Sequence, residues 1–458
     1  MPKRPNLVVI LVDDLRHDEF GAGGHPYLET PHVDRIAREG ALFERAFHTT
    51  PICSPNRASI LTGQYASRHG VIDNVARDAM SHQLPNYHLA LQRLGYRTAH
   101  IGKWHMGNDG MPRPGYDRWV SFDGHGRILN PRLNHDGRYV EHRGHITDLL
   151  NAMAVEWIEH RHDRPWSLFL AHKAVHPDAE QAADGTFRVE GYIPAERHRH
   201  LYEGAVFPKK PNMLAPAEVA KRKPAWKEIF ALRAAPSSQA LLKAIQAGTQ
   251  EEIRQRARMM AAVDEGVGMI FEALERTGQA DDTAIFFLGD NGYFFGEHGL
   301  GPERRFAYEE GIRSPFLLRY PRRVRAGARE RRLVICQDIA PTAIELAGGR
   351  PGPQIQGRSL LPLFGRGRVP WRRSLLVEYW AEQAFPWLVG MTYKAVRTGR
   401  WKLIHWVNRG RAGELDELYD LERDPFELRN LNAVRAAQPV KARLVRELRR
   451  LVADALGL

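Results

Sequence analysis

Three residues with distinct chemical properties stand close together at 53–63, where the chain reads CSPNRASILTG. Cys53 is a potential nucleophile, and Pro55 is typical of the first turn of a helix. We therefore predict a helix that begins near Cys53, whose free backbone N–H groups would favour a bound anion. Arg57 lies one helical turn after Cys53, so its charge can face the same anion. The segment predicts a nucleophile beside an anion-binding site.

Two pairs of oxygen-bearing side chains follow apolar runs and predict a metal site. Asp13 and Asp14 come directly after NLVVILV, and Asp290 and Asn291 come directly after TAIFFLG. Such runs form strands that are buried on both faces of a parallel sheet, and the carboxyl ends of these strands meet at one edge. Carboxylate and amide oxygens suit hard divalent cations. A divalent ion would bridge the two pairs if the strands are neighbours, and the ligand type alone leaves magnesium and manganese open.

Further cationic and imidazole side chains lie in loops after predicted strands. HIGKWHMG at 100–107 carries Lys103 and His105, and LAHKAVHPD at 170–178 carries His176. GEHGLGPERRFAYEEGIRSP at 296–315 carries Arg304, a fixed charge that can bind an anion through two donors. An imidazole can transfer protons in catalysis. Because the chain has 21 histidines, position alone does not separate a catalytic histidine from a chance one.

Alternating strands and helices must position these residues. Strand-like TAHIG and WSLFLAH alternate with helix-like HVDRIAREG, ITDLLNAMAVEWIEH and 251–276, which predicts an α/β fold with a mostly parallel sheet sandwiched by helices. Residues 178–240 lack a sustained period, so we expect long loops and short helices at the rim of the site. After about 370, YKAVRTGRWKLIHWV and ELDELYDLERDP predict antiparallel strands, and ARLVRELRRLVADAL predicts a terminal helix. We divide the chain into a large domain at 1–368 and a C-terminal subdomain at 369–458.

Composition limits the classes of function. Two cysteines allow no cysteine-based zinc cluster, and Cys336, which lies away from the motifs in the sequence, is interpreted as an inert core thiol. The net charge of +12 is spread along the chain, so we expect no nucleic-acid partner, although a positive field would attract small anions. No apolar run is long enough to span a membrane, so we expect no membrane partner. The start, MPKRPNLVVILVDD, is typical of a strand, which predicts a cytoplasmic protein, or a periplasmic one if a leader has been removed.

Together the motifs resemble those of the type I sulfatases, the formylglycine-dependent family of the alkaline phosphatase superfamily. The likeness runs from PNLVVILVDD through CSPNRASILTG, GKWH and CQDIAPTAIELAG at 336–348 to ELYDLERDP near the C-terminus. It implies an alkaline-phosphatase-like α/β domain followed by a small antiparallel sheet with a helix. It also implies that a formylglycine-generating enzyme oxidises Cys53 to formylglycine. The hydrated aldehyde carries two hydroxyls, of which one would attack sulfur and the other would later release the sulfate.

The resemblance implies a role for each motif residue. Lys103 and His105 would contact the formylglycine and the sulfate, and His176 would donate a proton to the leaving alcohol. The family usually has a lysine where this chain has Arg304, and arginine does not readily give up a proton, so more of the proton transfer rests on His176. The implied calcium ligands are Asp13, Asp14, Cys53 as formylglycine, Asp290 and Asn291.

We therefore predict a sulfatase that hydrolyses sulfate monoesters, with carbohydrate sulfates as the favoured class. A phosphonate monoester or phosphodiester hydrolase of the same superfamily is the alternative, although Asn291, Lys103 and His105 favour sulfate. A third possibility is a non-catalytic binder of sulfated glycans in which Cys53 stays unmodified. The loops at 108–145 and 178–240, with Trp380 and Trp387, would determine the substrate, and the sequence leaves the oligomeric state open.

Overall fold

The apolar run NLVVILV forms β1 (Asn6–Val12), the strand around which the main sheet is built. β1 lies parallel to β11 (Thr283–Gly289) on one side and to β8 (Trp166–His172) on the other. The strands that precede the two predicted metal-binding pairs are therefore neighbours, as the metal prediction requires. The structure, a computed structural model, describes residues 4–75, 78–181, 187–223, 225–244, 248–382, 388, 390–407 and 413–458.

Within these residues the main sheet has ten strands, and the prediction of a mostly parallel sheet is confirmed. Only β12 and β6 run opposite to the others, because each pairs antiparallel with its neighbours. The order across the sheet is β13 (Ala328–Glu330), β2 (Ala41–Phe43), β12 (Phe316–Arg319), β11, β1, β8, β4 (Arg97–Gly102), β5 (Arg118–Ser121), β6 (Arg132–His135) and β7 (Arg138–Glu141).

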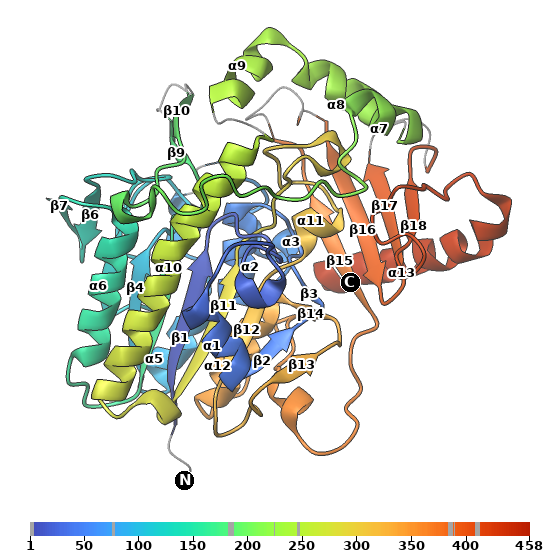
Figure 1. The fold of residues 1–458 in the computed structure, drawn as a ribbon. Coiled ribbons are helices and arrows are strands. Elements are labelled where there is room, and N and C mark those ends of the chain that lie inside the picture. Colours follow the sequence, from blue (N-terminus) through green and yellow to red (C-terminus); the bar gives the residue numbers. More distant parts are fainter. Residues whose placement is uncertain are drawn as a thin grey trace.

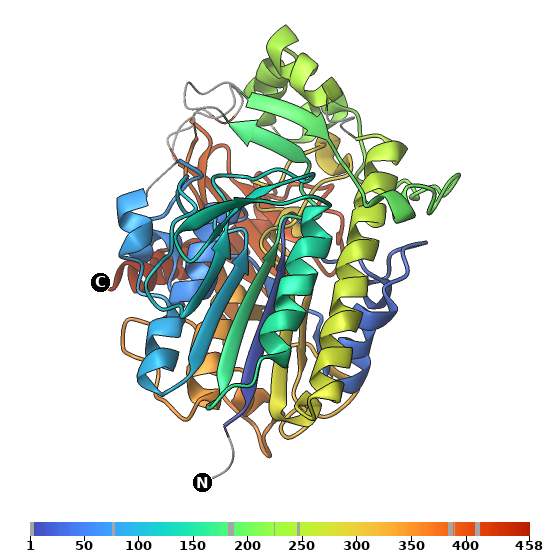
Figure 2. The same ribbon diagram turned by 90° about the vertical axis from the view of Figure 1, so that its left-hand side faces the viewer.

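Helices cover both faces of the sheet, which explains why β1 is apolar throughout. Successive side chains of a strand point to opposite faces. Leu7, Val9 and Leu11 join one core, whereas Val8 and Ile10 join the other. The first core is closed by α2 (Cys53–Thr62), α5 (Tyr87–Arg93) and α12 (Ile339–Leu346), and the second by α1 (Pro31–Glu39), α6 (Ile146–Glu159) and α10 (Gln250–Arg276), as Figures 1 and 2 show.

The region 178–240 lies above the edge at which β1 ends (Figure 1). The expected short helices are present as α7 (Pro216–Arg222), α8 (Trp226–Arg233) and α9 (Pro236–Ala244). The expectation of loops is wrong for β9 (Asp178–Gln181) and β10 (Phe187–Gly191), which pair antiparallel. These strands read DAEQ and FRVEG, so they lack the apolar alternation that would have predicted them.

The C-terminal segments form an antiparallel sheet packed by a helix, as predicted. Its strands are β15 (Ser374–Tyr379), β16 (Thr392–Thr398), β17 (Trp401–Val407) and β18 (Glu417–Asp420). One face packs against α13 (Gln438–Leu456), and the other shares a core with the larger part of the chain (Figure 1). The division at 368 and 369 stays a prediction. None of the described helices is long and apolar enough to cross a membrane.

The remaining short elements connect these layers. β3 (Ala46–Phe47) pairs with β14 (Val334–Ile335) beside the main sheet. The short helices are α3 (Ala66–His69), α4 (Asp78–His82) and α11 (Glu309–Ile312).

Candidate active site

The carboxyl ends of β1 and β11 bring the two acidic pairs together. The backbone N–H of Asp14 donates to Asp290 Oδ1 at 2.9 Å. The Asn291 amide donates to Asp14 Oδ1 at 2.8 Å. Asp14 has a φ of 60°, a left-handed conformation that residues with a Cβ seldom adopt. Such strained backbone is found mainly where a function requires it, and here it turns Asp14 towards the end of β11.

The start of α2 places Cys53 beside these carboxylates. Cys53 is the first helical residue, Pro55 lies in the first turn as predicted, and the Asn74 carboxamide accepts the Ser54 N–H at 3.0 Å. Cys53 Sγ lies 3.4 Å from Asp13 Oδ1. One ligand atom each from Asp13, Asp14, Cys53 and Asp290 all lie within 4.8 Å of one another. The structure thus brings the predicted nucleophile and the predicted metal ligands into one cluster.

The surroundings of Cys53 make its thiol a weak nucleophile. The side chain is fully buried. Burial, together with the negative charge of Asp13, raises the pKa of Cys53 well above its usual value. Since the thiolate is the reactive form of cysteine, an unmodified Cys53 has little nucleophilic character at neutral pH. Without a bound cation, the Cys53 thiol is therefore a poor nucleophile.

The acidic cluster fits a hard divalent cation. Asp14 Oδ2 and Asn291 Oδ1 are buried, and among the described residues neither accepts a hydrogen bond. Burial raises the pKa of Asp14, and burial with the charge of Asp13 raises that of Asp290. A divalent cation would satisfy the two oxygens and stabilise the ionised carboxylates. The residues present therefore suit such an ion.

Three cations face the three carboxylates. Arg57 Nε lies 2.8 Å from Asp290 Oδ2, and Arg304 Nη1 lies 3.0 Å from Asp14 Oδ1. Lys103 forms an ion pair with Asp13. Burial alone would raise the pKa of Asp13, but Lys103, with His176 and Arg57, holds it well below its usual range. Three positive charges match three negative ones, so a divalent cation would leave an excess of positive charge for an anionic ligand.

Three imidazole rings line one side of the cluster. The His105 and His125 rings lie 4.1 Å apart, and the His125 and His176 rings are stacked at 4.9 Å. His176 Nδ1 is 2.8 Å from the Pro177 carbonyl oxygen, which leaves Nε2 directed at Asp14 Oδ2, 4.0 Å away. The predicted residues His105 and His176 are therefore both at the site.

His125 was not predicted from the sequence. Its Nδ1 lies 3.4 Å from Lys103 Nζ, and its carbonyl oxygen accepts a hydrogen bond from Lys173 at 3.0 Å. The available signal was DGHG at 123–126, in which two glycines with positive φ flank the histidine. Such flanking fits a loop that brings its backbone close to another segment. The sequence related the whole loop at 108–145 to substrate choice but did not single out this residue.

Two further expectations have different outcomes. Cys336 was expected away from the motifs, which is wrong, because its Sγ lies 3.3 Å from His48 Nδ1 and this ring contacts Asn56 of the CSPNR motif. Burial raises the pKa of Cys336 to about 12, consistent with an inert thiol. The sequence related Trp380 and Trp387 to the choice of substrate. Lys394 Nζ lies 3.6 Å from the centre of the Trp380 ring, and Trp387 lies outside the described residues.

Comparisons with known proteins cover the whole of this architecture. The model of the sulfatase family matches residues 5–349, and that of the C-terminal region of N-sulphoglucosamine sulphohydrolase matches 296–454. The chain is 29% identical to an N-acetylglucosamine-6-O-sulfatase of Bacteroides thetaiotaomicron, over 94% of this chain and 83% of the relative.

Two solved structures share the fold. One, a complex with its substrate D-glucosamine-2-N,6-O-disulfate, is 26% identical with a TM-score of 0.83, over 99% of this chain and 98% of that chain. The other, a phosphonate monoester hydrolase of Agrobacterium radiobacter, is 23% identical with a TM-score of 0.78, over 99% of this chain and 96% of that chain. At this identity the second likeness concerns the fold alone.

Proposed function

Because the chain belongs to the sulfatase family, we propose that it hydrolyses sulfate monoesters of carbohydrates, with 6-O-sulfated glucosamine units as the first candidates. The observation that carries the proposal is the contact of Cys53 with the carboxylate cluster of Asp13, Asp14 and Asp290. Three cationic side chains form ion pairs with these carboxylates. The choice of sugar is supported by the N-acetylglucosamine-6-O-sulfatase relative and by the neighbour that holds a glucosamine disulfate.

Cys53 is the proposed site of formylglycine. When formed, the hydrated aldehyde supplies a nucleophilic hydroxyl where the thiol supplies none. The Sγ position, which stands in for an oxygen of that group, is 3.4 Å from Asp13 Oδ1 and lies at the first turn of α2. The backbone N–H groups of this turn favour the negative charge of a sulfate.

Asp13, Asp14, Asp290 and Asn291 are the proposed ligands of a resident calcium ion. Their oxygens are all hard donors, which is the preference of calcium, and magnesium or manganese is the alternative. When bound, the ion acts as a Lewis acid on the sulfate oxygens. The amide of Asn291 is held by its hydrogen bond to Asp14 Oδ1, so its oxygen is oriented before any ion binds.

The remaining residues divide into those that bind sulfate and those that move protons. Arg57, Lys103 and Arg304 supply positive charge, and Arg304 cannot serve as a proton donor. His105 is suited to accept a proton from the nucleophile. The step requires the imidazolium form of His176, in which the Nδ1 N–H donates to the Pro177 carbonyl oxygen and the Nε2 N–H is the proton passed to the leaving alcohol.

The test compares ester classes on protein produced together with a formylglycine-generating enzyme. We expect kcat/KM for N-acetylglucosamine 6-sulfate to exceed that for bis(4-nitrophenyl) phosphate and phenylphosphonate esters. The reverse order would overturn the sulfatase proposal in favour of the phosphonate and phosphodiester alternative. Mass spectrometry of the peptide that contains Cys53 is expected to show the aldehyde. A thiol in protein that binds the sulfated sugar without turnover would instead identify a glycan binder.

Two cysteine variants give the matched control. We expect Cys53→Ala to abolish turnover while the circular dichroism spectrum is unchanged, and Cys336→Ala to remain active, because only Cys53 lies against the carboxylates. Turnover by Cys53→Ala would refute the assignment of the nucleophile.

A further inference from the structure

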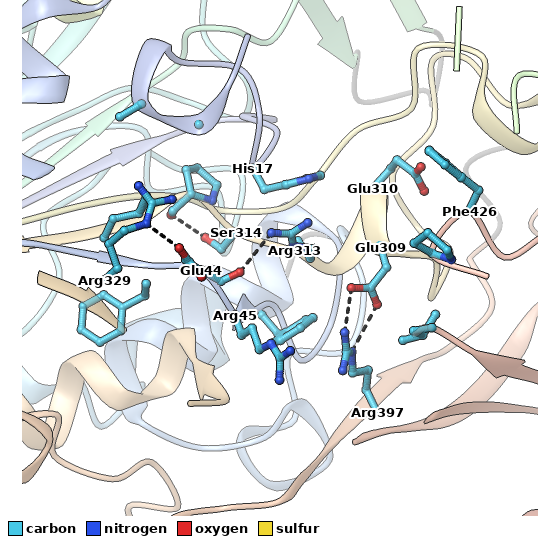
Figure 3. Close-up of a pocket in the computed structure, with 18 of the residues that line it drawn as sticks. His17, Glu44, Arg45, Glu309, Glu310, Arg313, Ser314, Arg329, Arg397 and Phe426 are labelled. Atoms are coloured by element: carbon cyan, nitrogen blue, oxygen red, sulfur yellow. Dashed lines mark hydrogen bonds and ion pairs between the residues drawn. The ribbon is translucent and has the colours of Figure 1, made fainter. Parts of the chain in front are cut away.

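A cavity of about 540 Å³ lies between the main sheet and the C-terminal sheet. Its walls come from 42–47 around β2 and β3, from 309–315 at α11, and from 421–426 after β18. Figure 3 shows the charged residues that face it. The proposed nucleophile, metal ligands, sulfate-binding cations and catalytic histidines are not among its described lining residues, so this cavity is distinct from the candidate active site.

Two of the three glutamates that line the cavity are already paired with cations. Glu44 forms an ion pair with Arg329, and Glu309 forms one with Arg397 (Figure 3). Glu44 also pairs with Arg331, and Glu309 also pairs with Lys402. Glu310 accepts a hydrogen bond from the Asn212 amide at 2.8 Å and lies 3.4 Å from His298 Nε2. Glu44 and Glu309 are therefore paired with cations, whereas the neighbour of Glu310 is a histidine whose pKa burial lowers to about 4, so this ring is neutral near pH 7.

Arg313 forms no direct ion pair of this kind with a described residue. Its guanidinium donates to the backbone carbonyl of Glu44 at 3.0 Å, and in the described part of the chain no carboxylate lies within ion-pair distance of it (Figure 3). Burial lowers the pKa of Arg313, although the charges of Glu309, Asp18 and Glu310 partly offset this effect. A guanidinium that is removed from water without a carboxylate is costly unless an anion joins it.

His17 adds an unused polar atom next to Arg313. Its Nδ1 is buried and makes no hydrogen bond to any described residue. Burial, and then the charge of Arg313, lowers the pKa of His17 to about 3. The ring is therefore neutral and can donate one N–H. Arg45 stands exposed on the same lining, and its side chain has no ion pair with a described residue.

We propose that this cavity is a second oxyanion site, which binds a sulfate group through Arg313 and His17, with Arg45 at its entrance. Guanidinium and imidazole N–H groups are the donors that sulfate accepts from proteins. The volume far exceeds that of one sulfate ion, and Phe47, Pro315 and Phe426 add apolar wall. The sulfate group is therefore either free or carried by a sugar unit that the remaining space admits.

The experiment locates the anion directly and then measures its affinity. Crystals of the full chain are soaked in sodium selenate, whose selenium is found by anomalous scattering. We expect a peak between Arg313 and His17 in addition to one near Cys53. A peak near Cys53 alone would overturn the proposal.

Titration calorimetry with sodium sulfate provides the second measurement. We expect two sulfate-binding sites in the wild-type protein. In Arg313→Gln, sulfate should bind at least about tenfold more weakly at one of them. Arg276→Gln is the matched control, because Arg276 pairs with Glu159 and neither residue lines the cavity. Arg45→Gln, at an exposed position, is expected to weaken the same site a few-fold even if Arg313→Gln does not fold. Unchanged affinity in both cavity variants would refute the site.

Competition by N-acetylglucosamine 6-sulfate at this site would identify a sugar sulfate as its ligand, and competition by free sulfate alone would identify the inorganic ion.

Discussion

At the scale of single residues, the site combines strained backbone with buried polar atoms that lack partners. Asp14 and His105 both have φ values near 60°. Each such conformation costs on the order of 1–3 kcal/mol, and it persists only where the surrounding structure enforces it. The gain is orientation, because Asp14 reaches the end of β11 and His105 faces His125. The unpaired oxygens of Asp14 and Asn291 then mark where a cation fits.

Replacement of His176 tests its role as proton donor. We expect His176→Ala to lower kcat/KM for a sugar sulfate by about 10²–10⁴, the usual contribution of general acid catalysis. For 4-nitrophenyl sulfate the loss should be under about tenfold, since nitrophenolate leaves without protonation. Steady-state kinetics on both esters measures the difference. His200→Ala, at an exposed histidine, is the control, and equal losses on the two esters would remove the proton-donor role.

Metal removal tests the ligand set without reference to turnover. We expect a chelator to lower the melting temperature, and calcium at 100 times its dissociation constant to restore about 2.7 kcal/mol of stability. Asn291→Ala should reduce this calcium-dependent shift, because it removes an oxygen that makes no hydrogen bond to any residue in the described ranges. Scanning calorimetry with and without calcium gives the result, and a shift that is unaffected by the variant would exclude Asn291 as a ligand.

At the scale of elements, α10 carries a buried acid that links three segments. Glu252 accepts hydrogen bonds from Tyr293 after β11, from Tyr192 after β10, and from the backbone of Gly248 before the helix. Burial raises the pKa of Glu252 from 4.5 to about 7. The folded protein thus holds a proton that the unfolded chain releases between these pH values. The contribution of Glu252 to the free energy of unfolding is complete below about pH 4.5 and is lost as the pH rises to about 7.

Glu252→Gln should remove this pH dependence. A neutral amide does not titrate, so the wild type is expected to lose stability relative to the variant by on the order of 3 kcal/mol between pH 4.5 and 7.5. Melting temperatures of both proteins across this range provide the measurement. A constant difference between them would show that Glu252 does not titrate in that window.

At the scale of the whole molecule, the C-terminal sheet is joined to the larger part of the chain by both apolar and charged contacts. Trp226 and Tyr308 share a core with Tyr393 and Tyr419. Across the same boundary, the fully buried Lys402 lies 2.8 Å from Glu309 Oε1 and 2.7 Å from Glu427 Oε1. Such contacts predict that the two parts unfold together. Two separate calorimetric transitions would instead indicate that 369–458 is an independent unit.

Lys402→Met should destabilise the protein by about 3–5 kcal/mol, because it removes the cation paired with the buried Glu427 and leaves Glu309 with Arg397 alone. The melting temperature of the single transition measures this loss. Lys441→Met is the control, since Lys441 forms a partly exposed pair with Asp416 and should change stability by less than about 1 kcal/mol. The double variant with Glu427→Gln is expected to recover part of the loss. Equal effects of the two lysine variants would contradict the role of the buried network.

The sequence by itself determined the layers of the fold and most of the candidate site. The β-branched apolar runs before Asp13 and Asp290 are typical of buried parallel strands, and the carboxyl ends of such strands meet at one edge. Local spacing also placed Pro55 and Arg57 correctly relative to Cys53, because these relations lie within one helix turn.

Only the tertiary structure determined which residues far apart in the sequence meet. The position of His125 between His105 and His176 depends on the path of the loop after β5, and no periodic pattern encodes that path. The lack of a direct ion pair at Arg313 likewise became visible only when the partners of Glu44, Glu309 and Glu310 were known. Ion pairing and burial are properties of distance in space, so a sequence pattern of charged residues leaves them open.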